Sequence, residues 1–267
     1  MGFLEAFILG LVQGATEFLP ISSSGHLVLV PAVLNWDAPS LVFDTTVHLA
    51  TLVAVIAVLW RDIRDLIIAW WRGLVYRQPL KTTESRIAWW LILASVPAIL
   101  VGFLLEETFK SLFLDPRAVG AFLLITALLL IMAELIGRRI RNLSNITWVD
   151  SILIGIGQAA AIAPGISRSG ATMSVGMFCG LTREAAARFS FILSIPIIAG
   201  AGLTQLFDLV RYGSFSAEAP SLLIGFTAAA ICGYISVRWL LAYLKKRPLY
   251  PFAIYCIIAG VLAIIFL

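Results

Sequence analysis

Gln13-Gly14-Ala15-Thr16-Glu17-Phe18-Leu19-Pro20-Ile21-Ser22-Ser23-Ser24-Gly25-His26 is a polar stretch inside a very apolar part of the chain. A similar stretch runs from Gln158 to Pro164 and continues as Gly165-Ile166-Ser167-Arg168-Ser169-Gly170-Ala171-Thr172. Both contain Gln, then Pro and Ile, then a Ser-rich triplet and Gly, with Arg168 standing where Ser23 stands in the first. A duplicated, helix-breaking hydroxyl loop is what a buried polar site in a membrane protein requires.

The composition indicates an integral membrane protein. Of the 267 residues, 61% are hydrophobic and 13% are charged, whereas soluble domains are about one quarter charged. This apolar excess cannot be buried in one soluble core of this size. The net charge of +4 comes from clustered residues and fits a membrane surface better than nucleic acid, so we expect no nucleic-acid partner.

Six segments are long and apolar enough to cross a membrane, which takes about 20 residues. They cover about 42–60, 87–105, 118–136, 188–206, 221–243 and 250–267. Two further apolar regions, about 3–34 and 150–180, are interrupted by the polar stretches, and we expect each to form a re-entrant helical hairpin with a polar tip. The predicted fold is an all-α integral membrane protein with a single membrane domain over 1–267.

The positive charges predict the orientation of these segments. Fourteen Lys and Arg residues lie on one side of the six predicted spans, in or beside the segments 61–86, 137–149 and 244–249 and the start of the fourth span, which we interpret as loops. The other side has three: Lys110, Arg117 and Arg211. The positive-inside rule assigns the first group to the cytoplasm, and it assigns the N-terminus, 106–117 and 207–220 to the outside.

This orientation predicts an internal repeat. The first hairpin enters from outside and the second from the cytoplasm, and each is followed by three spans. An odd number of spans in each half inverts one half relative to the other. The halves 1–149 and 150–267 are therefore predicted to form an inverted-topology repeat.

In the first stretch, Gln13 and Glu17 are four residues apart and share one face of a helix that Pro20 ends. A carboxylate in a bilayer needs a partner or a cation, so two interpretations of Glu17 remain open. One is a buried ion pair with Arg168. The other is a ligand, together with the Gln13 amide oxygen, for a hard divalent cation such as Mg²⁺ or Ca²⁺.

The hairpin tip supplies hydroxyls and a tight turn through Ser22, Ser23, Ser24 and Gly25. His26 follows them as a candidate general base, general acid or nucleophile. His48 lies inside a span without such neighbours, and we expect it to pack or to have a minor supporting role. Asp44 lies near a predicted interface, where a solvated or capping role is expected.

The second stretch has the chemistry of an anion site. Arg binds phosphate through two parallel hydrogen bonds and stays charged. A Gly-containing loop that opens a helix presents backbone N–H groups and a positive dipole end. The candidate residues are Ser167, Arg168, Ser169, Gly170 and Thr172. The alternative for Arg168 is a structural role that ties the two hairpin tips together.

The two stretches together resemble a known family. Gln13 to His26 resembles the (Glu/Gln)-x-x-x-Glu motif with its Ser-rich and His extension, and Pro164 to Thr172 resembles the P-G-x-S-R-S-x-x-T motif, of bacterial undecaprenyl-diphosphate phosphatases of the bacitracin-resistance type. The resemblance covers essentially the whole chain. It implies that the lipid substrate undecaprenyl diphosphate loses its terminal phosphate and becomes the carrier reused in cell-wall synthesis. It also implies the bacterial plasma membrane, a site open to the periplasmic side, and a divalent metal.

The resemblance further implies roles for single residues. Glu17 is the essential acid, Arg168 holds phosphate, and Ser23 or His26 falls at the nucleophile, with a water activated by His26 as the third alternative. Gln13 occupies the Glu/Gln position, so one carboxylate and one amide would hold the metal. We expect the phosphate groups to be bound by Arg168 and by Ser22, Ser24, Gly25, Ser167, Ser169, Gly170 and Thr172.

A transporter is the alternative from another class. Inverted repeats with broken helices that meet in mid-membrane are typical of transporters, and a lipid-phosphate flippase, alone or combined with the phosphatase, fits the same topology. A pure transporter has no need for a hydroxyl–His–acid cluster that faces an Arg. The sequence leaves open the oligomeric state, a homodimer included, the metal and the preferred length of the prenyl tail.

Overall fold

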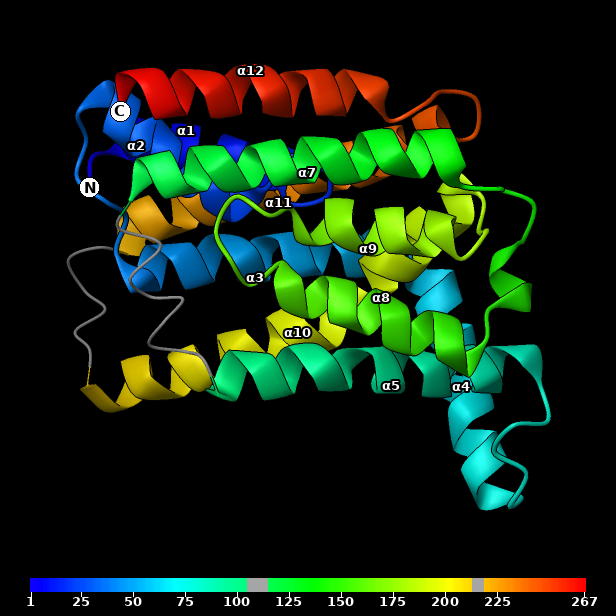
Figure 1. Cartoon of the computed structure of the whole chain (residues 1–267). Helices are drawn as coiled ribbons and strands as arrows, with labels where there is room; N and C mark the ends of the chain where they lie inside the picture. The colour runs from blue at the N-terminus through cyan, green and yellow to red at the C-terminus, as the bar shows by residue number, and fades with distance from the viewer. Residues whose placement is uncertain (105–114, 213–218) are drawn as a thin grey trace.

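The computed structural model describes the backbone of residues 1–104, 115–212 and 219–267, and the side chains of these residues except 203–212. Over these ranges the chain forms helices, most of which lie side by side along one long axis, with both termini at one end (Figure 1). They are α1 Phe3–Thr16, α2 Ser23–Leu34, α3 Leu41–Val58, α4 Trp60–Val75, α5 Thr83–Leu104, α7 Pro116–Ile136, η1 Leu143–Asn145, α8 Trp148–Ala160, α9 Arg168–Phe178, α10 Arg183–Tyr212, α11 Ala219–Leu244 and α12 Tyr250–Phe266.

Among the described residues, five helices are long and apolar enough to cross a membrane, and each coincides with one of the first five predicted spans. They are α3, α5, α7, α11 and the Arg183–Gly202 part of α10. The sixth predicted span, 250–267, corresponds to α12, which has 17 residues and is shorter than the about 20 that a spanning helix takes. The segments 106–117 and 207–220 were predicted to lie on the outer side of the membrane. Of their basic residues, Lys110 and the side chain of Arg211 are not among the described parts of the chain.

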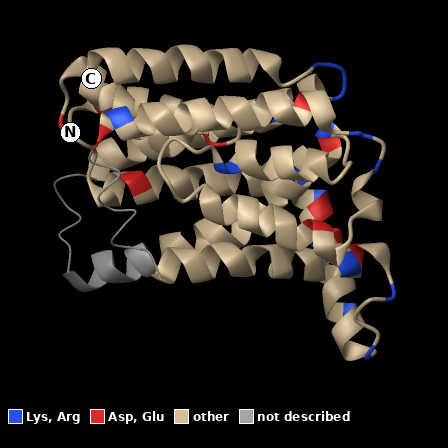
Figure 2. Ribbon diagram, in the orientation of Figure 1, with Lys and Arg blue, Asp and Glu red and all other residues tan. Residues whose placement is uncertain are grey.

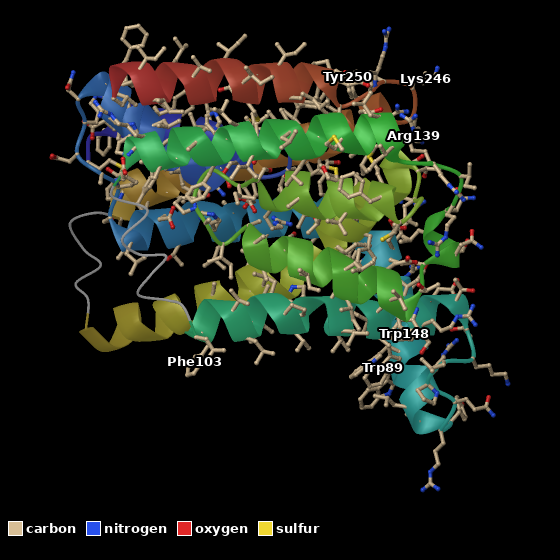
Figure 3. The ribbon with its side chains drawn as sticks, in the orientation of Figure 1. Trp89, Phe103, Arg139, Trp148, Lys246 and Tyr250 are labelled. Carbon is tan, nitrogen blue, oxygen red and sulfur yellow. The ribbon has the colours of Figure 1, made fainter. Side chains whose placement is uncertain are left out.

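The surface of the bundle is apolar, as a lipid-facing protein requires. Large side chains such as Phe103 and Leu223 are 82% and 67% exposed, and a soluble protein would not tolerate so many of them. Figure 3 shows Trp89, Trp148 and Tyr250 near one end of the bundle and Phe103 near the other. Trp and Tyr near a bundle end are typical of a membrane–water interface. The all-α membrane fold predicted from the sequence is confirmed at this level.

The segment 61–86 contains a helix where we expected a loop. In α4, Ile63 and Leu66 are buried while Arg64 and Asp65 between them are exposed, which is the spacing of an amphipathic helix. The charged residues had indicated a loop because they were counted without their spacing. Figure 1 shows α4 at the end of the bundle opposite the termini, running across the direction of α5.

Lys and Arg gather at the end of the bundle where α4 lies (Figure 2). Several of them are paired there. Buried Glu134 accepts hydrogen bonds from Arg139 at 2.6 Å and from Arg183 at 2.7 and 2.5 Å. Asp150 binds Arg141 at 2.7 Å and caps α8. These contacts connect α7, the loop after it, α8 and α10 at the charged end of the bundle.

Two glycines bring α7 and α12 into close contact. A Cβ atom on Gly120 would lie 2.8 Å from the carbonyl oxygen of Gly260, and one on Gly260 would lie 2.7 Å from that of Gly120. Small residues at a crossing point let membrane helices approach closely. The short helix α12 is therefore packed directly against a helix long enough to span.

Two helix pairs are broken at the polar stretches. The first pair is α1 and α2, which are interrupted between Thr16 and Ser23. The second is α8 and α9, interrupted between Ala160 and Arg168. The connection between α8 and α9 lies within the length of the bundle, not at its end (Figure 1). The breaks predicted for 3–34 and 150–180 are thus present, and their tips lie where polar side chains are shielded from lipid.

Candidate active site

The two polar tips touch each other in the interior of the bundle. The Gly165 N–H donates to Ser22 Oγ at 3.2 Å, and the Ser169 hydroxyl donates to the Leu19 carbonyl oxygen at 3.1 Å. Gly165 has φ +100°, and a Cβ atom there would lie 2.4 Å from the Val119 carbonyl oxygen. Glycine is therefore required at this contact by both conformation and space.

Thr126 of α7 holds the second tip in place. Its hydroxyl donates to the Gly165 carbonyl oxygen at 2.9 Å and accepts the Ser167 N–H at 2.9 Å. The residue is fully buried, so both of its hydrogen bonds are shielded from water. A single Thr in a spanning helix gave no sequence signal for this role.

Each tip begins its return helix with the same cap. Ser22 Oγ accepts the Gly25 N–H at 3.3 Å, and Ser167 Oγ accepts the Gly170 N–H at 3.0 Å. Ser22 has φ +70°, a left-handed conformation that is uncommon for a residue other than glycine and often marks a functional site. The N-termini of α2 and α9, with their positive dipole ends, therefore meet at the junction of the tips.

Glu17 lies at this junction and is 7% exposed. Its Oε1 atom accepts a hydrogen bond from Arg168 Nη2 at 2.5 Å. Its Oε2 atom accepts bonds from Ser23 Oγ at 2.6 Å and from Gln13 Nε2 at 2.9 Å. The ion pair with Arg168, one of the two interpretations left open by the sequence, is present, and it ties the two tips together.

A cavity of about 360 Å³ opens beside this cluster. Of the residues predicted from the sequence, it is lined by Glu17, Ser22, Ser23, Ser24, Ser167 and Arg168. A carboxylate, several hydroxyls and a guanidinium thus face one space. The cavity wall also includes apolar residues such as Ala98, Ile162, Ile197 and Ile198. A space lined by both polar and apolar residues suits an anionic group attached to an apolar chain.

His48 and Asp44 also line the cavity. His48 thus has contacts beyond packing, in keeping with the supporting role left open by the sequence, and Asp44 is partly exposed in the first turn of α3, as expected. His48 Nε2 lies 3.7 Å from Glu17 Oε2, and its Nδ1 lies 2.8 Å from the Asp44 carbonyl oxygen and 3.6 Å from the Asp44 carboxylate. The signal was available, because two ionisable residues four apart on one face of an apolar span indicate a functional site.

His26 is directed away from Glu17. Its Nδ1 lies 2.7 Å from the Ser22 carbonyl oxygen, and its Nε2 lies 2.6 Å from the Tyr255 hydroxyl, on whose ring it also stacks. It lines a different, apolar cavity between α2 and α12. Because both ring nitrogens are engaged there, His26 is not placed to take a proton from Ser23. Because His26 follows the serines in the sequence, we had expected it to be a candidate general base, general acid or nucleophile.

Four predicted phosphate ligands support the tips instead of lining the cavity. The N–H groups of Gly25 and Gly170 already serve the two caps. The Ser169 hydroxyl bonds Leu19, and Thr172 Oγ1 lies 2.7 Å from both the Arg168 carbonyl oxygen and Ser190 Oγ. These residues hold Arg168 in position.

The predicted metal ligands form a hydrogen-bonded pair in this structure. Gln13 turns its amide N–H toward Glu17, and its Oε1 has no partner among the described residues. Both Glu17 oxygens are already bound by protein donors. As arranged, Gln13 and Glu17 do not present two oxygens to one cation. The divalent cation stays a prediction.

The fold and the site together define an integral membrane protein in which an acid, a hydroxyl and an arginine form one buried cluster beside a cavity. The chain belongs to the family of bacitracin resistance protein BacA, whose family model matches residues 6–262. The family resemblance inferred from the two motifs is thereby confirmed.

Curated relatives match the chain along nearly its whole length. The undecaprenyl-diphosphatase of Geotalea daltonii is 42% identical over 270 residues, which cover 100% of this chain and 99% of the relative. That of Thermomicrobium roseum is 40% identical, with 99% and 98% covered. That of Moorella thermoacetica is 42% identical, with 99% and 97% covered.

Proposed function

We propose that this protein is an undecaprenyl-diphosphatase, which hydrolyses undecaprenyl diphosphate to undecaprenyl phosphate and phosphate. The observation that carries the proposal is the Ser23 hydroxyl, held 2.6 Å from a buried carboxylate whose other oxygen binds Arg168. All three residues line one cavity. The names of the curated relatives support the same substrate.

Of the three nucleophiles left open by the sequence, the geometry favours Ser23. Glu17 Oε2 accepts the Ser23 proton while Ser23 Oγ attacks the terminal phosphorus. The bond from that phosphorus to the bridging oxygen breaks, and undecaprenyl phosphate leaves. A water molecule then attacks the phosphoserine, phosphate leaves with the protons of that water, and the Glu17 proton returns to Ser23.

Proton transfer to Glu17 also prepares Arg168 for the transition state. Once Glu17 is neutral, its ion pair with Arg168 is lost and the guanidinium turns to the charge that develops on the phosphate. Arg has five N–H donors. In this structure Arg168 Nη2 donates to Glu17, and Nη1 donates to the Ser190 carbonyl oxygen at 3.2 Å. The first N–H groups of α2 and α9 add further donors for the phosphate oxygens.

The proposal includes the six-span, two-hairpin topology with inverted halves. The cavity reaches residues in the first turn of α3 and the last turn of α5, Asp44 and Gly102. These helix ends lie at the end of the bundle that holds the termini (Figure 1), opposite the Lys and Arg residues (Figure 2). The positive-inside rule then assigns the cavity mouth to the outer, periplasmic side of the bacterial plasma membrane.

The proposal needs no second copy of the chain, because one chain supplies every residue of the cluster. A homodimer is therefore a separate question, answered by measuring the mass of the purified particle. A flippase would use the same anion site but would have no use for a hydroxyl held against a buried acid. Phosphate release by the purified protein separates these two functions.

The test of Ser23 combines turnover with trapping of an intermediate. Purified protein in lipid nanodiscs is given a prenyl diphosphate labelled on the terminal phosphate, and the reaction is quenched rapidly. We expect acid-stable label on serine in the wild type, and a loss of more than about 1,000-fold in turnover for Ser23→Ala. If Ser23→Ala keeps a substantial part of the activity and neither protein traps label, water or His26 is the nucleophile and the serine mechanism is wrong.

A further inference from the structure

Gln158 is a buried amide with no assigned role in the proposed reaction. The residue is 2% exposed and lines the same cavity as Arg168. Neither its amide nitrogen nor its amide oxygen has a hydrogen-bond partner among the described residues. The side chain thus lines the cavity while both of its amide atoms are shielded. Because an unpaired buried amide destabilises a fold, a turn of this side chain toward the cavity would give the amide a ligand as its partner.

The first half of the chain shows what partner such an amide takes. Gln13 lies nine residues before the capping Ser22, and Gln158 lies nine residues before the capping Ser167. Gln13 donates to Glu17, four residues further on, at 2.9 Å. Four residues after Gln158 stands Ile162, which offers no acceptor. Gln158 thus has the position of Gln13 without the carboxylate.

We infer that Gln158 binds the diphosphate group of the substrate, with its amide N–H donating to a phosphate oxygen in the way that Gln13 donates to Glu17. This inference rests on the proposed function for the identity of the anion. The residues next to Gln158 in the cavity wall, Ala161 and Ile162, are apolar. Among the described residues that line this cavity, Gln158 carries an amide without a hydrogen-bond partner, so it is free to bind an anion that Arg168 also holds.

If Gln158 binds the diphosphate group, replacing it should lower activity without lowering the stability of the ligand-free protein. Gln158→Met keeps an unbranched side chain of similar length and removes an amide that is unpaired without ligand. We expect the melting temperature of the ligand-free protein to stay the same or rise. With farnesyl diphosphate as substrate, we expect kcat/KM to fall about 10- to 100-fold, the effect of losing one hydrogen bond to a charged group.

Two variants serve as matched controls. Ser174 of α9 is fully buried, its hydroxyl also has no partner among the described residues, and it is absent from the described cavity wall. Ser174→Ala should therefore leave both kcat/KM and KM unchanged. Gln13→Met removes an amide that is paired with Glu17, so this variant should lose melting temperature and activity together.

A binding measurement that needs no turnover completes the test. Methylenediphosphonate, a diphosphate analogue that is not hydrolysed, should raise the melting temperature of the wild type and of Ser174→Ala, and raise it much less in Gln158→Met. The inference is overturned if Gln158→Met matches the wild type in KM and in this shift. It is also overturned if the variant is destabilised without ligand as much as Gln13→Met, since Gln158 would then be structural.

The outcome for the proposed function is read separately. If the wild type releases no phosphate from the prenyl diphosphate, the phosphatase assignment fails. If the analogue nevertheless stabilises the protein through Gln158, the role of this residue in diphosphate binding is supported.

Discussion

Replacing Arg168 by Lys tests whether the guanidinium shape, and not only its charge, is needed. Arg168 uses two nitrogens at once, Nη2 to Glu17 at 2.5 Å and Nη1 to the Ser190 carbonyl oxygen at 3.2 Å. The single ammonium of Lys cannot keep both contacts and also bind phosphate through two parallel bonds. The variant keeps the positive charge, so Glu17 is not left as an unpaired buried anion.

The size of the loss follows from the contacts that disappear. Losing one donor to the transition state costs about 100- to 1,000-fold in rate. Losing the bond to the Ser190 carbonyl oxygen removes a contact worth about 1 kcal/mol that holds the side chain in position. If that energy is lost from the transition state, the rate falls by a further factor of about 5. We expect kcat of Arg168→Lys with a prenyl diphosphate to fall by at least about 100-fold.

The assay is phosphate release by purified, nanodisc-embedded protein at saturating farnesyl diphosphate. Arg238→Lys is the matched control, because Arg238 is exposed on α11 and contacts Tyr234 at 3.3 Å, and we expect wild-type turnover from it. Near-wild-type turnover of Arg168→Lys at normal expression would refute the assignment of Arg168 to the transition state.

Two further predictions concern the metal and the topology. Gln13→Glu places a second carboxylate beside Glu17 and should stay active with less divalent metal, and an unchanged metal requirement in a titration of this variant would contradict the prediction of a metal held by this pair. Glu17→Gln should be inactive at every metal concentration, since Glu17 is both the expected anionic ligand and the acceptor of the Ser23 proton. Single cysteines at Gln78 and Ala38, in a background without the native cysteines, should be labelled from opposite sides of intact cells; labelling of both by an impermeant reagent would contradict the proposed topology.

Local sequence patterns were sufficient to predict the long apolar helices and the positions at which two helix pairs are interrupted. Apolar length predicted α3, α5, α7, α10 and α11, because a lipid environment requires long, internally hydrogen-bonded apolar segments. Proline and the Ser-Gly tips predicted the two interrupted pairs for an equally local reason. The helix α4 could have been found in the same way, since Ile63 and Leu66 already show helical spacing.

The choice between the two histidines required the tertiary structure. His26 follows the serines in sequence but faces Tyr255, 229 residues away. His48 belongs to another helix but lies 3.7 Å from Glu17. Which face of a helix meets the cavity depends on the rotation of that helix against its neighbours, and sequence distance carries no information about that rotation.

The sequence by itself therefore determined the membrane class, five long apolar helices, the broken helices and the family, because hydropathy, helix breaking and motif spacing are properties of contiguous residues. Only the tertiary structure decided which side chains share the cavity. Glu17 and Arg168 are 151 residues apart and meet through the packing of two hairpin tips. Gln158 lacks a partner for the same reason: the fold brings it to the cavity, and no neighbour in its own sequence offers the acceptor that Glu17 offers to Gln13.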